Sequence, residues 1–82
     1  MGRLKNWYAT VDEGNYVVYV QDKPTVIKGI QERAITTLYE DRTTGLWTVV
    51  VTPAGGEKKM IHQSSNRRNA EKAMFSWIRS NP

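Results

Sequence analysis

Short hydrophobic runs separated by polar turns follow one another along the chain and predict a mostly β structure. Residues 7–11 and 16–20 are rich in β-branched and aromatic side chains, which favour strands, and the segment between them contains Gly14, which suits a turn. We therefore expect a β-hairpin here. Depending on its register, its two sides would carry Tyr8, Thr10, Tyr16, Val18 and Val20 on one and Trp7, Ala9, Val11, Val17 and Tyr19 on the other.

The signals conflict after this hairpin. Asp22 and Pro24 suit the start of a helix, as a cap and a first-turn residue, and apolar positions between 26 and 34 could line one helix face. The β-branched residues and Gly29 in the same stretch lower the helix propensity. We expect a short helix over residues 25–33, with a strand as the alternative.

Three further strands are predicted in the second half of the chain. Residues 35–39 and 46–52 are rich in β-branched and aromatic side chains, and a loop with Gly45 separates them. Residues 57–62 follow a Pro-Ala-Gly-Gly turn and are more polar, as expected of a strand at the edge of a sheet.

The last predicted element is an amphipathic helix that Ser64, Ser65 or Asn66 can cap. Its apolar positions recur with the i, i+3, i+4, i+7 spacing of a single helix face. These positions are Ala70, Ala73, Met74, Trp77 and Ile78. We expect them to pack against alternate residues of the strand over residues 47–51.

Together these elements predict one α+β domain over residues 1–82. It would contain an antiparallel sheet of four or five strands, a C-terminal helix packed on one face, and the possible short helix in the middle. With 82 residues its core is small, and packing must hold it because the chain has no cysteine and hence no disulfide.

Composition argues against catalysis. The chain has a single histidine, His62, no cysteine nucleophile, and no recognisable catalytic or phosphate-loop motif. We expect a non-enzymatic protein without a metal ion or other cofactor. No apolar run approaches the ~20 residues that span a bilayer, and the N-terminus has no hydrophobic signal region. We therefore expect a cytoplasmic protein that makes no membrane contact.

The distribution of charge is the clearest functional signal. Four cations and one carboxylate give residues 66–80 a charge of +3, out of a formal net charge of +4. Arg67 and Arg68 occupy the predicted first helical turn, where the helix dipole disfavours cations, and this placement suits a bound anion such as phosphate. Other cations on this helix and in the preceding strand could extend the patch. The candidate phosphate-binding residues are Arg67, Arg68, Lys72, Lys58, Lys59 and Arg79.

The segment from residue 65 to residue 73 resembles the start of the last helix of a double-stranded-RNA-binding domain, where Arg67 and Arg68 stand in place of that family's Lys-Lys pair. The resemblance covers residues 35–78 and implies a strand–strand–strand–helix unit. It also implies that Arg67, Arg68 and Lys72 contact phosphates across an RNA groove. The same order, with Gly45-Leu46-Trp47 opening a strand, is similar to ethylene-response-factor DNA-binding domains and to arm-binding domains of phage integrases, in which the sheet enters the groove.

These observations predict a small module that grips the phosphates of duplex RNA or DNA with its C-terminal helix. Two alternatives remain open. The surplus of aromatic residues also fits a protein-interaction module, such as a small phage or bacterial accessory or inhibitor protein. Arginine and tryptophan together could bind a small nucleotide at an oligomer interface.

Overall fold

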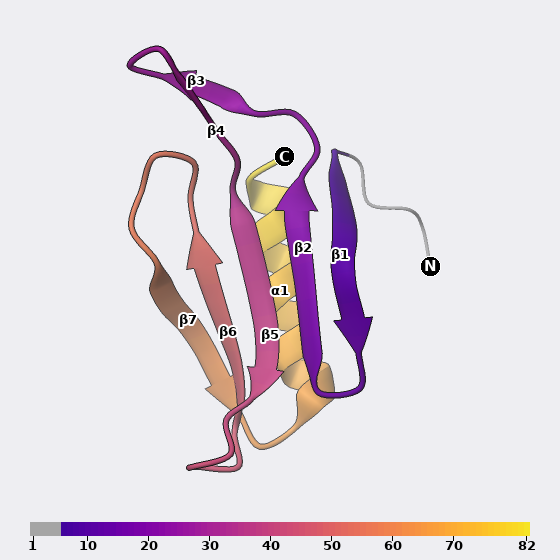
Figure 1. The fold of residues 1–82 in the computed structure, drawn as a ribbon. Coiled ribbons are helices and arrows are strands. Elements are labelled where there is room, and N and C mark those ends of the chain that lie inside the picture. Colours follow the sequence, from indigo (N-terminus) through magenta and orange to yellow (C-terminus); the bar gives the residue numbers. More distant parts are fainter. Residues whose placement is uncertain (1–5) are drawn as a thin grey trace.

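A five-stranded antiparallel sheet with one helix across it forms the body of the protein (Figure 1). The computed structural model describes residues 6–82, so residues 1–5, on which the expected lack of a signal region partly depends, lie outside it. The elements are β1 (Trp7–Glu13), β2 (Tyr16–Gln21), β3 (Thr25–Ile27), β4 (Ile30–Glu32), β5 (Ile35–Glu40), β6 (Trp47–Thr52), β7 (Lys59–Ser64) and α1 (Arg67–Ser80). The strand order is β1-β2-β5-β6-β7, which confirms the predicted fold class.

The expected short helix in the middle of the chain is wrong, and the alternative of a strand is correct. Strands β3 and β4 form a separate two-stranded hairpin at one end of the main sheet (Figure 1). Lys28 and Gly29 join them, and both have positive φ, 51° and 80°. Two successive residues with positive φ form the tight turn that matches strand twist, so turn geometry and β-branched pairing outweighed the helix signals.

Strand pairing gives the main sheet two distinct faces, because residues directly opposite each other in a ladder point to the same side. One row runs through Val17, Leu38 and Val49 and faces the helix. The neighbouring row runs through Val18, Thr37 and Val50 on the other side, which we call the open face.

The register shifts in both edge pairings, between Ala9 and Val11 on β1 and between Val49 and Val50 on β6. The shift in β1 pairs Val11 with Val18, which places Val11 on the open face and corrects the expectation that it shares a side with Trp7. Bulges at both edges also hinder pairing with further strands.

The core lies between α1 and the sheet. Ala70, Met74 and Ile78 are buried on the inner side of the helix, as predicted from their spacing. They meet Val49 and Val51 of β6, which are completely buried. Burying one side chain of this size contributes roughly 1.5–3 kcal/mol. The other two predicted positions, on the flank of the helix, are half-buried.

Polar contacts hold both ends of the helix in place. Asn66 is the N-cap, and its side chain accepts a hydrogen bond of 2.8 Å from the backbone N–H of Arg68. At the other end, the indole Nε1 of Trp7 donates to the carbonyl of Asn81 at 3.1 Å, which ties the helix to the edge strand β1. The ring of Trp7 also meets Trp77 edge-on, with centroids 6.0 Å apart. Within residues 6–82, no helix is long and apolar enough to cross a bilayer.

We predict that Gly55→Ala destabilises the protein by about 1–2 kcal/mol. Gly55 lies in the β6–β7 turn with φ +71°, and an added Cβ would collide with Ile27 Cδ1 of the β3–β4 hairpin. Urea unfolding measures the loss. Gly14→Ala is the matched control, because a Cβ there meets nothing within 4 Å. Equal stability of both variants would contradict the positive φ of Gly55 and its close approach to Ile27.

Candidate nucleic-acid interface

Three of the predicted cations line one stripe on the solvent side of α1. Arg68, Lys72 and Arg79 are exposed, and at 3.6 residues per turn their positions fall within about 40° of one another. They line a shallow groove of about 430 Å³ together with Glu71 and Phe75. The rise of a helix spreads the three cations over about 16 Å along its axis. We call this surface the cation stripe, meaning Arg68, Lys72 and Arg79.

The cation stripe lacks neutralising carboxylates. The one ion pair among residues 6–82 joins Arg67 to Glu71, with Nε 3.6 Å from Oε2. Glu71 is the only acidic residue of α1, and the first helical turn contains none. The stripe therefore presents three positive charges to solvent without a paired anion.

Arg67, the first of the predicted phosphate-binding cations, already has partners within the fold. Its guanidinium lies over the ring of Trp47, 5.0 Å from the centroid, and donates a hydrogen bond to the carbonyl of Gly14. With Glu71 it thus has three partners, and it links the start of the helix to β6 and to the β1–β2 turn. A sequence signal does separate Arg67 from Arg68. Arg67 lies three residues before the buried Ala70, and this spacing places Arg67 on the inner side of the helix.

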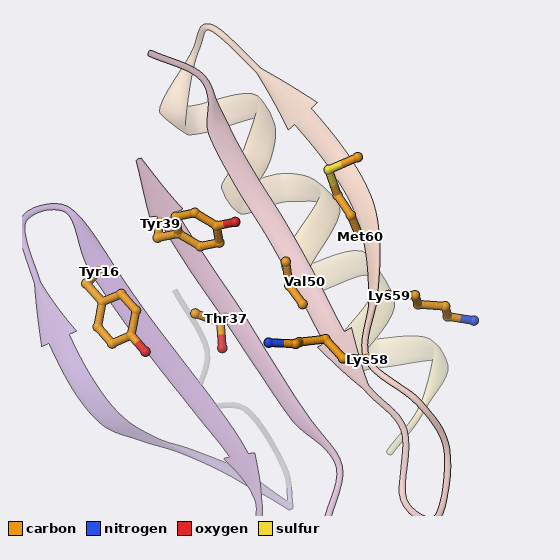
Figure 2. Close-up of a pocket in the computed structure, with 7 residues that line it drawn as sticks. All are labelled: Tyr16, Thr37, Tyr39, Val50, Lys58, Lys59 and Met60. Atoms are coloured by element: carbon orange, nitrogen blue, oxygen red, sulfur yellow. The ribbon is translucent and has the colours of Figure 1, made fainter. Parts of the chain in front are cut away.

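The structure separates Lys58 and Lys59 from the cation stripe. Both line a depression of about 450 Å³ on the open face, with Tyr16, Thr37, Tyr39, Val50 and Met60 (Figure 2). Figure 2 shows the side chain of Lys58 lying over this face, with the helix behind the sheet. Lys59 also lies at the other end of β7 from the start of the helix, roughly 17 Å away along the strand. Since α1 runs back toward the β6–β7 turn, the sheet rather than this distance separates the lysines from Arg79.

Phe75, one of the residues that line this groove, connects the helix to β2. Phe75 is half-buried and meets the ring of Tyr19 edge-on, with centroids 5.5 Å apart. Burial raises the pKa of the Tyr19 hydroxyl, and the negative charges of Asp12 and Glu71 raise it further. Sequence reasoning missed Phe75, although its spacing of i+7 from Arg68 and i−4 from Arg79 places it on the same stripe.

The single histidine and the acidic residues are the other candidate ligands in the described part of the chain. His62 is half-buried in β7, and its Nε2 atom is buried without a hydrogen-bond partner. Residues 6–82 contain no group of three or more His, Cys, Asp or Glu side chains placed to hold a metal ion. The arrangement at α1 is suited to contact with an extended anion.

No family model, curated protein or solved structure matches this chain. The resemblance to the double-stranded-RNA-binding domain stays a prediction. Strands β5, β6 and β7 followed by α1 have the order that it implies, but the β3–β4 hairpin stands where that family has its first helix.

We predict that Arg67→Gln lowers the free energy of unfolding by about 1–2 kcal/mol, because it removes a cation–π contact, a hydrogen bond and an i,i+4 ion pair. Arg68→Gln is the matched control, with the same charge change one residue away, and should stay within about 0.5 kcal/mol of the parent. Chemical denaturation measures both. Equal losses would contradict the structural role of Arg67.

We predict that Tyr19→Phe reduces the loss of stability at alkaline pH. A tyrosine whose pKa is raised in the folded state stabilises the protein fully below the unfolded-state pKa of about 10, and this contribution disappears as pH rises through the folded-state value. The parent should therefore lose more stability than the variant as pH rises past about 10. Urea midpoints across this pH range make the comparison, and parallel curves would contradict it.

Proposed function

We propose that this protein binds nucleic acid through phosphate contacts made by the cation stripe of α1. The observation that supports the proposal is the placement of Arg68, Lys72 and Arg79 on one exposed stripe, without a carboxylate partner among residues 6–82. Phosphate contacts dominate the affinity of proteins for nucleic acids, so such a stripe would supply most of the binding free energy.

The dimensions of the elements favour the helix over the sheet as the binding element. The major groove of B-DNA is about 12 Å wide and admits a helix or a two-stranded ribbon. Five strands spaced ~4.8 Å apart are roughly 19 Å across, which is too wide to enter it. We therefore propose that α1, rather than the sheet, is set against the groove of a duplex, and that the sheet faces away from it.

The test is a fluorescence anisotropy titration of labelled duplex DNA, duplex RNA and single strands across a range of salt concentrations. For three contacts on duplex DNA we expect the logarithm of the binding constant to fall against the logarithm of salt concentration with a slope of roughly −3. The double variant R68Q/K72Q should weaken binding and reduce this slope by about 2. Neither side chain has a polar partner among residues 6–82, so the free energy of unfolding should not change.

The matched control is K58Q/K59Q, which removes the same two charges from the other side of the sheet. This variant should keep the salt dependence of the parent's binding constant, apart from a small effect of its lower net charge. An equal loss in both double variants would contradict binding by the helix. Binding that does not depend on salt, or no binding to any of the polymers at low salt, would overturn the proposal.

A further inference from the structure

The open face of the main sheet is a second surface, and no element of residues 6–82 covers it. Of the six exposed large hydrophobic side chains in the described residues, four lie there: Tyr8, Tyr16, Ile35 and Met60. The helix packs on the opposite side (Figure 1). Contiguous apolar patches of this kind on small proteins mark interaction surfaces.

Among residues 6–82, the strand positions between the corners of the open face carry no charged side chain. Its register positions carry tyrosine, aliphatic, threonine, methionine and glutamine side chains. They are Tyr8, Val11, Tyr16, Val18, Val20, Ile35, Thr37, Tyr39, Thr48, Val50, Thr52, Met60 and Gln63. Depletion of charge with enrichment of tyrosine and methionine is typical of the centre of a protein–protein interface. A polyanion would need several cations here, so these observations favour a protein partner.

Three charged residues of the described chain border this face: Glu13 lies toward one corner, and Lys58 and Lys59 lie toward the opposite corner. Glu13 pairs with Tyr16 at the last position of β1, one edge strand, beside the β1–β2 turn. Lys58 directly precedes β7, the other edge strand, at the far end of the sheet from that turn. Its side chain lies over the face near Thr37 in Figure 2.

We propose that a second copy of this chain packs on the open face and forms a two-fold symmetric dimer. A two-fold axis in the plane of the interface, perpendicular to the line from Glu13 to Lys58, brings Lys58 of each copy to Glu13 of the other. One such operation makes both ion pairs at once, which is the self-complementarity that an isologous interface requires. The uncharged side chains between the corners then meet each other, and tyrosine and threonine hydroxyls can both donate and accept hydrogen bonds.

The area of the open face limits how much surface this dimer can bury. Five strands at ~4.8 Å spacing, each contributing about five residues at ~3.4 Å, cover roughly 400 Å² in flat projection. A standard interface removes about 800 Å² of accessible surface from each partner. The face is therefore smaller than a standard interface, and we expect a weak, reversible dimer. This inference does not depend on nucleic-acid binding, because it uses the other side of the molecule.

The test is sedimentation velocity of the purified protein from micromolar to millimolar concentration, without nucleic acid. We expect a monomer–dimer equilibrium in the parent. Glu13→Lys and Lys58→Glu should each weaken it about tenfold, because each places like charges together twice. The double variant E13K/K58E reverses both partners and should restore dimerisation to near the parent value.

Lys72→Glu is the control, with the same charge change as Lys58→Glu but on the helix side, and it should leave the equilibrium unchanged. A further variant, Thr37→Arg, puts a bulky cation in the centre of the face and should give a monomer. Circular dichroism checks that each variant is folded. Since Glu13 and Lys58 are exposed, their reversal should keep the fold even if Thr37→Arg does not.

Several results would overturn the proposal. If the parent remains monomeric at millimolar concentration, the dimer is excluded, and a different protein becomes the candidate partner of the open face. A folded Thr37→Arg variant that still dimerises would place the interface elsewhere. A double variant that does not regain the parent equilibrium would exclude the pairing of Glu13 with Lys58.

Discussion

Packing of one side of α1 against the centre of the sheet is the contact on which the rest of this structure depends. Ala70, Met74 and Ile78 meet Val49 and Val51 there, and all five side chains are almost completely buried. In a chain of 82 residues without cysteine, this interface is the main source of stability. It holds the helix across the strands, and hydrogen bonds and aromatic contacts at the two helix ends then determine its position.

Because a single helix covers a single face, the molecule presents two outer surfaces with different chemistry. The solvent side of α1 carries three cations around the half-buried ring of Phe75, and none of them has an ion-pair partner in the described part of the chain. The other side of the sheet carries tyrosine, threonine and aliphatic side chains, with an acidic residue toward one corner and two lysines toward the opposite corner. A polyanion matches the first surface and a second copy of the chain matches the other, so the two proposals do not compete for the same residues.

The contrast between Arg67 and Arg68 shows how structure divides neighbouring residues of the same type. Arg67 lies on the inner side of the helix, where Trp47, Gly14 and Glu71 occupy its guanidinium, whereas Arg68 faces solvent. A guanidinium stacked on an indole loses much of its freedom to bind a ligand. Sequence reasoning treated the pair as one site, because adjacency along the chain does not reveal which side chain has local partners.

The local sequence pattern determined the strands of the main sheet, the helix and its buried side, because side-chain periodicity and capping by Asn66 act over a few residues. It also identified Arg68, Lys72 and Arg79 as exposed cations. For residues 25–33 the sequence left helix and strand open, and the structure decided for the β3–β4 hairpin, in which Lys28 adopts a positive φ. Tertiary structure alone decided the bulge that moves Val11 to the open face. It also separated Lys58 from the helix. These outcomes depend on which strands pair and in what register, and a shift of one residue reverses the face to which every side chain points.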